Sequence, residues 1–226
     1  MNAKRNVKKR TTKLPFLIGL ALAGTLLAGG APSLVVQASA QSASAASAGT
    51  RLDVADGTTA SYRVQEQLAG INFPNEAVGT TSSVMGTIVL APDGSVNSAQ
   101  SKLTIDLRTL KSDQEMRDGY LQKRTLETDK FPMVEFVPKS IQGLPSPLPM
   151  NGQAGVTLAG DMTIHGTTRP VTWTGIVTFA KDGAVAGRAT TNFTFATFGL
   201  TKPSLARVLS VGDKIELEVA FKFKRS

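Results

Sequence analysis

The feature that most constrains the fold is a period-two alternation of apolar and polar residues, which recurs from residue 84 to the end of the chain. Its clearest example is KIELEVAFKFKR near the C-terminus, where every second residue from Ile215 to Phe223 is apolar and most of those between are charged. Successive side chains of a β-strand point to opposite faces, so this pattern gives one buried and one solvated face. It predicts antiparallel strands.

The same alternation appears in several shorter segments separated by turn-forming residues. No helical segments intervene at regular intervals, so the spacing predicts six to eight antiparallel strands in a barrel or sandwich. The alternating segments are VMGTIVL (84–90), KLTIDLRTL (102–110), VTWTGIVTF (171–179) and TTNFTFATF (190–198). The expected turns are APDGS (91–95), KDGA (181–184) and SVGDK (210–214).

Two segments interrupt the alternation. In SDQEMRDGYL, Ser112 and Glu115 have the spacing of a capping box, which predicts a short helix over about 113–121. The segment 143–152 contains three prolines, which cannot donate to a β-ladder, so it is expected to be a loop.

The N-terminus has the three parts of a secretory signal peptide. A basic start is followed by the apolar stretch LPFLIGLALAGTLLAGG and by an Ala-x-Ala cleavage pattern at Ala38 and Ala40. Residues 1–40 are therefore predicted to be a signal peptide, with an uncleaved anchor as the alternative. The small residues of 41–50 predict a flexible linker, and residues 51–226 the folded domain.

Charge and residue usage exclude several functional classes. The chain carries a net charge of +8, but six of its basic residues and none of its acidic ones lie in 1–40, so the rest is nearly neutral. A nearly neutral domain argues against nucleic-acid binding. With no cysteine and a single histidine, disulfides, thiol nucleophiles and a typical zinc site are not expected, and no cofactor or metal is predicted.

The single histidine, His165, lies in the stretch GDMTIHGTTRPVTWTG (160–175) beside Arg169 and Asp161. A catalytic triad would need partners from elsewhere in the fold. Gly166 supplies a permissive backbone and Pro170 restricts the residue before it to extended geometry, which together indicate a turn between two strands. We therefore predict that His165 is a turn residue and that the chain has no catalytic residue.

Several motifs, taken in order, resemble the YceI-like family over residues 60–224. The most specific is the hairpin GDMTIHGTTRPV (160–171), with Met162 where the family usually has leucine. The family's first strand usually contains a His-Ser pair, which is missing here, and GINFPNEAVG (70–79) reads as a loop instead. The other matching residues are Arg117, Asp118, Leu121, Phe131, Pro132, Val134, Phe136, Phe198, Gly199, Gly212, Asp213 and Ile215.

The resemblance implies an elongated eight-stranded antiparallel β-barrel, lipocalin-like, with one or two short helices. It also implies an apolar tube that binds a polyisoprenoid, such as an isoprenoid quinone, or another amphiphilic lipid. Apolar inward positions of the strands, together with Phe198 of the Phe-Gly motif, would form the tube wall. These predicted ligand-binding residues are Ile105, Leu107, Phe136, Trp173, Phe193, Phe195, Phe198, Val219 and Phe221.

The favoured function is an exported, periplasmic or secreted, lipid carrier or sequestering protein that is not an enzyme. One alternative is a structural or stress-related envelope protein, in which the same phenylalanines fill the barrel. Another is a hydrolase or isomerase, which would need titratable residues at inward positions, whereas the alternation places them outward. Arg117 and Asp118 are expected to tie the short helix to a neighbouring element or to lie at the tube mouth. A homodimer and a transient membrane contact stay open.

Overall fold

The computed structural model describes residues 49–226 except 71, 205 and 207. The predicted signal peptide (1–40) and nearly all of the predicted linker (41–50) lie outside these residues, and the first strand begins at Thr50. No helix in the described part of the chain is both long and apolar enough to cross a membrane.

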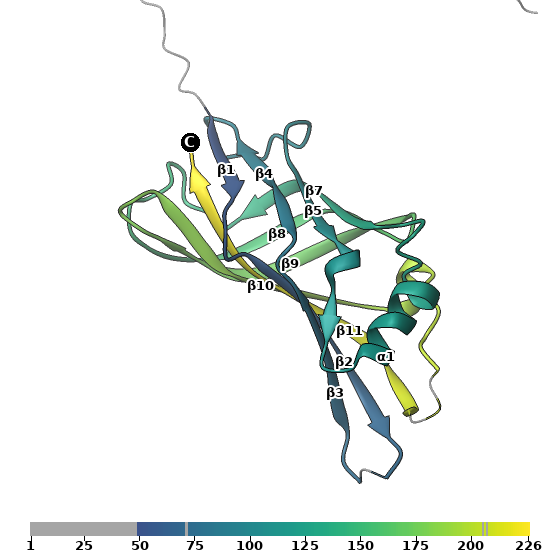
Figure 1. Ribbon diagram of the computed structural model, residues 1–226. Helices are drawn as coiled ribbons and strands as arrows, with labels where there is room; N and C mark the ends of the chain where they lie inside the picture. The colour runs from purple at the N-terminus through teal and green to yellow at the C-terminus, as the bar shows by residue number, and fades with distance from the viewer. Residues whose placement is uncertain (1–48, 71, 205, 207) are drawn as a thin grey trace, which may run out of the picture. The chain divides into compact units, whose positions relative to one another are not determined.

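All of the strand pairings are antiparallel, and eight strands close into a barrel (Figure 1). The closed order is β1-β4-β5-β7-β8-β9-β10-β11, and β11 then pairs with β1. This arrangement confirms the predicted eight-stranded barrel. The strands are β1 (Thr50–Val54), β2 (Thr59–Leu68), β3 (Asn75–Thr81), β4 (Val84–Leu90), β5 (Lys102–Asp106), β6 (Lys111–Ser112), β7 (Met133–Gln142), β8 (Gly152–Ile164), β9 (Thr167–Phe179), β10 (Ala184–Thr194) and β11 (Val208–Arg225).

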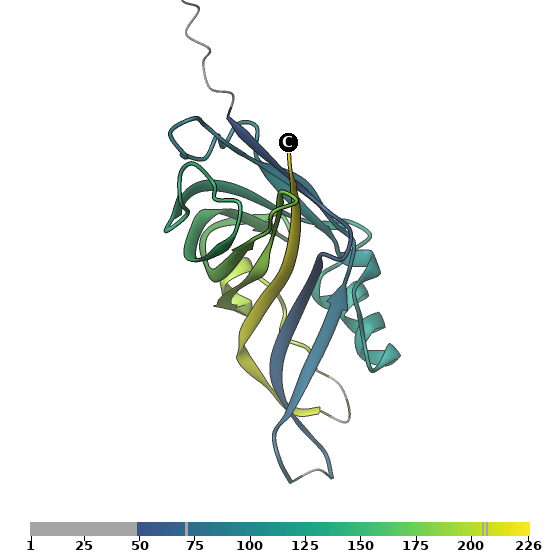
Figure 2. The ribbon, with the colours of Figure 1, turned by 90° about the vertical axis from the view of Figure 1, so that its left-hand side faces the viewer.

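The β2–β3 hairpin extends the sheet beyond the closed ring, as Figures 1 and 2 show. The C-terminal part of β11 pairs with β1, and its N-terminal part pairs with β2. Thr58 fixes the bend between β1 and β2, because its hydroxyl contacts the carbonyls of Ala55 and Lys222 and accepts from the Lys222 amide at 3.0 Å. The barrel and its extension are therefore joined through one long strand.

Two predicted loops lie partly or wholly within strands in the structure. The segment read as a loop over 70–79 contains the start of β3, which pairs with β2 along its whole length. The predicted turn at 210–214 lies inside β11, where Val211 pairs with Glu66 but Ile215 pairs with Val64. A β-bulge accommodates the extra residues of β11. Gly212 and Asp213 therefore belong to an irregular part of the strand and not to a turn.

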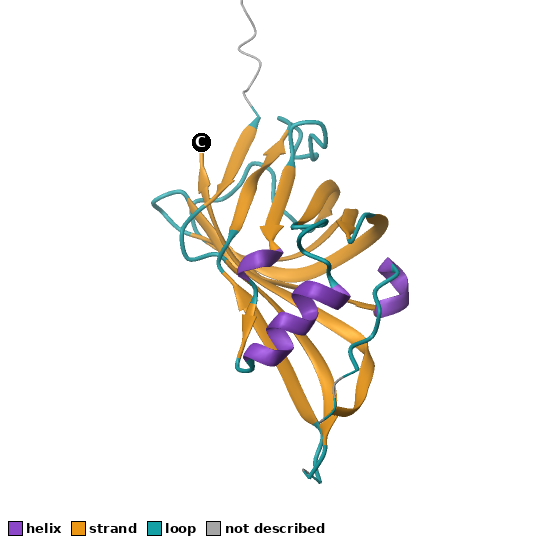
Figure 3. Ribbon diagram, turned by 45° about the vertical axis from the view of Figure 1, so that its right-hand side comes forward, coloured by secondary structure: helices purple, strands orange, loops and turns teal. Residues whose placement is uncertain are grey.

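The predicted helix is present but shorter and differently capped. The α-helix found in the described part of the chain, α1, spans Glu115–Tyr120 and continues into the π-helical turn η2 (Leu121–Thr125), and these helical turns lie against the sheet (Figure 3). Gln114 is the N-cap, so the expected capping box is wrong. Ser112 lies in β6, and its hydroxyl donates instead to Asp118 at 2.7 Å. Among residues 49–226, the structure also has the 3₁₀ turns η1 (Leu107–Thr109) and η3 (Phe195–Phe198).

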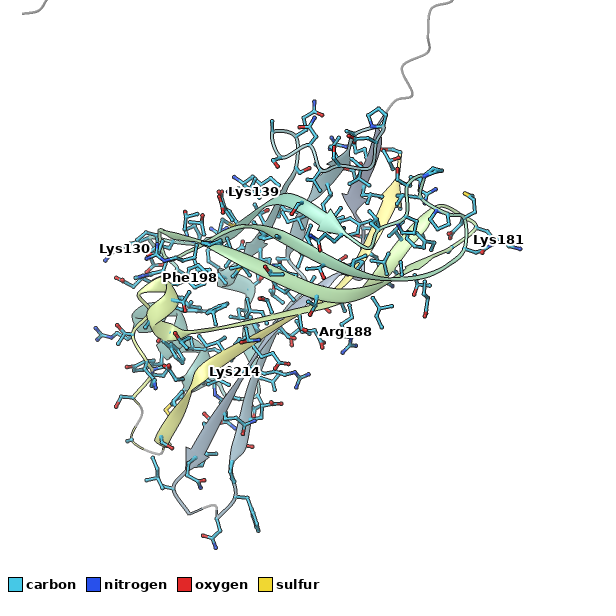
Figure 4. All side chains as sticks on the ribbon, turned by 180° about the vertical axis from the view of Figure 1, so that it is seen from behind. Lys130, Lys139, Lys181, Arg188, Phe198 and Lys214 are labelled. Atoms are coloured by element: carbon cyan, nitrogen blue, oxygen red, sulfur yellow. The ribbon has the colours of Figure 1, made fainter. Side chains whose placement is uncertain are left out.

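Two apolar clusters lie along the inside of the barrel. The first includes Trp173, Phe136 and Ile215 and surrounds the part near η3. The second includes Phe179 and Phe223 and lies toward β1 and the C-terminus. Charged residues such as Arg188 and Lys214 project from the outer surface, whereas Phe198 lies inside (Figure 4). The alternation therefore sorts the two faces as predicted.

Candidate functional site

An elongated apolar cavity of about 250 Å³ occupies the barrel interior. Residues of both apolar clusters line it, from Trp173 and Ile215 in the first to Val185 and Phe223 in the second. The barrel is thus not filled by its own side chains. Eight strands leave just enough interior width for one slim ligand.

Eight of the nine predicted wall residues line this cavity. They are Ile105, Leu107, Phe136, Trp173, Phe193, Phe195, Val219 and Phe221. Phe198 does not line it. Its fully buried ring packs edge-on against Phe193 with the ring centroids 4.7 Å apart, so it supports the wall from behind.

The wall also contains a buried ion pair, which the period-two alternation of the strands did not predict. Arg117 of α1 donates to Glu66 of β2 at 2.7 Å, and both residues line the cavity. Their side chains are only 10% and 5% exposed. Arg117 also donates to Asp113, and Asn75 donates to Glu66 at 3.1 Å. The expectation that titratable groups point outward is therefore wrong at these two positions, and Glu218 of β11 also borders the cavity.

The sequence does contain a pattern that indicates an inward position for Glu66. It continues the inward alternation of Ala60, Tyr62 and Val64 along β2, all of which line the cavity. This segment departs from the family pattern, which hid the alternation. The sequence predicts that Arg117 ties the helix to a neighbouring element, and its partner in the structure is Glu66 of β2.

The surroundings fix the protonation of this polar region. Burial alone would lower the pKa of the Arg117 guanidinium, but its hydrogen bond to Asp113 and the charge of Glu66 outweigh burial and raise that pKa. Burial raises the pKa of Tyr62 to about 12. Arg117 is therefore charged and Tyr62 neutral throughout the physiological range.

Two cavity-lining side chains in the described part of the chain carry buried polar atoms without a hydrogen-bond partner, Thr125 Oγ1 and Trp173 Nε1. The phenolic oxygen of Tyr62 is also buried, and hydrogen bonding to the Ser112 side chain partly offsets the effect of burial on its pKa. Leaving a buried donor unpaired costs about 1–3 kcal/mol. Unpaired polar groups of this kind are uncommon in a buried core.

The histidine lies in the turn between β8 and β9. His165 and Gly166 have φ angles of 50° and 73°, which match the two central positions of a type I′ hairpin turn. His165 Nε2 lies 2.8 Å from Glu127 Oε2, and its ring packs on Phe131 with centroids 4.5 Å apart. His165 is not among the residues that line the cavity. The described residues also contain no cluster of three or more His, Cys, Asp or Glu suited to a metal ion.

Comparison with protein families identifies one match over nearly the whole barrel. The sequence model of the YceI-like domain matches residues 54–223. A UPF0312 protein from Pseudomonas putida (strain W619) is 33% identical over 113 residues, which is 46% of this chain and 54% of the relative. The chain thus spans about half the length of this curated relative.

Two solved structures share the fold at low sequence identity. A polyisoprenoid-binding domain from Saccharophagus degradans, implicated in plant cell wall breakdown, has a TM-score of 0.61 at 12% identity. The match covers 78% of this chain and 98% of that domain. BcnA from Burkholderia cenocepacia has a TM-score of 0.50 at 17% identity, over 73% of this chain and 95% of BcnA.

Proposed function

Because the chain belongs to the YceI-like family, we propose that it binds a polyisoprenoid, or a similar amphiphilic lipid, inside its barrel. It acts as a carrier or sequestering protein for this lipid, with no covalent chemistry. The predicted signal peptide would export it to the periplasm or the cell exterior.

The cavity is the observation that carries the proposal. Aliphatic and aromatic side chains from both apolar clusters line a continuous space of about 250 Å³. Burial of apolar surface contributes about 0.8 kcal/mol per CH₂ group. A slim hydrocarbon tail can therefore gain most of its affinity here without polar contacts. The polyisoprenoid-binding description of the Saccharophagus degradans domain supports the same ligand class.

The ion pair favours binding over acid–base catalysis. Glu66 is committed to Arg117 and Asn75, and Arg117 to Glu66 and Asp113. A general acid or base needs a proton that it can exchange at working pH. The charge of Arg117 and the neutral state of Tyr62 both resist such exchange.

Lipid extraction tests the proposal directly. Protein purified after expression of the full sequence is extracted with organic solvent, and the extract is analysed by mass spectrometry. A mock purification from cells without the protein is the control. We expect a polyisoprenoid or similar amphiphile that the control lacks. Ligand-free protein that also fails to take up added polyisoprenoid would contradict the proposal.

A further inference from the structure

We infer that the far end of the β2–β3 hairpin inserts into a lipid bilayer, with which the protein exchanges its ligand. This inference rests on the proposed function, because it names the donor or acceptor of the same ligand. The contact surface is formed by Phe73, in the loop between β2 and β3, and by Leu209 at the start of β11. Figures 1 and 2 show the hairpin and the start of β11 reaching away from the closed ring.

Two large apolar side chains are exposed at this end of the sheet. Phe73 is 76% exposed and Leu209 is 68% exposed. Val208 pairs with Leu68, the last residue of β2, and the register then shifts, so Leu209 lies at a β-bulge. The loop that carries Phe73 begins directly after Leu68. Phenylalanine and leucine are side chains that enter the acyl region when a protein binds to a membrane surface.

The segments around these two side chains carry no charge. Residues 67–75 (QLAGINFPN) and 208–212 (VLSVG) contain no aspartate, glutamate, lysine or arginine. Glu76 and Asp213, which follow these segments, are each paired with a basic residue. Insertion of this surface therefore buries no unpaired charge, and an apolar bilayer fits it better than a partner recognised by charge.

The apolar lining of the cavity reaches the protein surface beside Leu209. Pro203, Val208 and Val211 line the cavity, and all three are only partly buried. A hydrocarbon tail that leaves the bilayer at Leu209 therefore meets apolar side chains on its way into the barrel. This route avoids the unfavourable exposure of its CH₂ groups to water.

The opposite end of the cavity is covered by the proline-rich segment 143–152. Leu144 and Leu148 of this segment pack against the second apolar cluster. Arg225 donates to the carbonyl oxygens of Leu148 at 3.3 Å and of Pro149 at 3.0 Å, which fastens the segment to the end of β11. Exchange through the end beside Leu209 needs no such contact to break.

The first test places an indole at the tip of the hairpin. Phe73→Trp is mixed with vesicles of brominated phosphatidylcholine, whose acyl-chain bromines quench an indole inside the bilayer. The control Ile176→Trp changes a side chain of β9 that is 57% exposed, and the unsubstituted protein gives the background from Trp173. We expect quenching above background, with a blue shift of the emission, for Phe73→Trp alone. Quenching at position 73 that does not exceed that at position 176 would overturn the inference.

The second test measures lipid exchange. Phe73→Ser/Leu209→Thr removes both apolar side chains and keeps the cavity wall, because neither residue lines it. Uptake of a polyisoprenoid-tailed benzoquinone from phosphatidylcholine vesicles should slow at least about tenfold, since the contact that holds the protein at the bilayer is lost. The control Ile176→Thr should keep the original rate. Equilibrium binding of the same quinone, delivered in detergent micelles, should be the same in all three proteins.

The outcomes separate this inference from the proposed function. If the double variant takes up the quinone from vesicles at the original rate, bilayer insertion is wrong while lipid binding stands. Uptake that requires an added membrane-protein fraction would replace the bilayer by a protein partner and overturn the inference. Failure of the unsubstituted protein to bind the quinone from vesicles and from micelles would contradict the proposed function, and the fluorescence test would still decide insertion.

Discussion

Arg117 on α1 and Glu66 on β2, separated by 51 residues in the chain, form an ion pair of 2.7 Å on the wall of the barrel cavity. The pair fastens the short helix to the extended β2–β3 part of the sheet. Together with Glu218, the pair supplies the charged residues of a mostly apolar wall.

Arg117→Met should destabilise the protein strongly. It leaves Glu66 as a buried carboxylate without its cation, which typically costs about 3–5 kcal/mol. The free energy of unfolding from urea titration measures the effect. The double variant Glu66→Leu/Arg117→Met removes both charges and should recover most of the loss, because an apolar pair can replace a buried ion pair.

An exposed ion pair that also involves β2 is the matched control. Arg63 of β2 and Glu76 of β3 lie 2.9 Å apart but are 36% and 40% exposed. Arg63→Met should cost less than about 1 kcal/mol, as exposed pairs usually do. Equal losses for Arg63→Met and Arg117→Met would show that burial does not strengthen the Arg117 contact.

The strands were predictable because alternation records burial directly. From Ile215 to Phe223 every second side chain lines the cavity, and the β8–β9 hairpin was located from its turn residues. The bulge in β11 was not predictable, because Gly212 and Asp213 are equally typical of a turn. Only the pairing with β2 distinguishes the two cases.

The polar part of the site could not be predicted from the sequence, for a different reason. Arg117 and Glu66 are brought together by tertiary packing of a helix on a distant strand, and no spacing in the chain records that contact. Whether Trp173 has a hydrogen-bond partner likewise depends on its neighbours in space. The sequence could assign Trp173 to the wall, but it could not show that its indole is unpaired.

Filling the cavity should weaken lipid binding strongly. Ala189 of β10 lines the cavity, so Ala189→Trp places a large ring where the tail would lie. We expect at least a tenfold loss of affinity for a polyisoprenoid, with a stability change of about 1–3 kcal/mol at most. Ala186 lies three residues away on the opposite face of the same strand. Ala186→Trp should bind lipid normally, and a loss of binding there would point to a site outside the barrel.

The β8–β9 turn should affect stability and not lipid binding. His165→Ala removes the contact with Glu127 and places alanine at a φ of 50°, so we expect a loss of about 1–2 kcal/mol. His165→Asn should lose less, because asparagine tolerates this left-handed conformation. Thermal unfolding and lipid titration of both variants check the prediction. A folded His165→Ala protein that no longer binds lipid would make the turn part of the site.

Alkaline pH should destabilise the barrel through Tyr62. Burial raises the pKa of Tyr62 from its ordinary 10.0 to about 12, so between these values the folded protein holds a proton that the unfolded chain has released. Stability from this group is complete below pH 10 and is lost as the pH rises to about 12. The loss should be about 2 kcal/mol greater than in Tyr62→Phe, which lacks the ionisable group. Urea unfolding of both proteins across this range measures the difference. Parallel curves for the two proteins would show that Tyr62 ionises as it does in water.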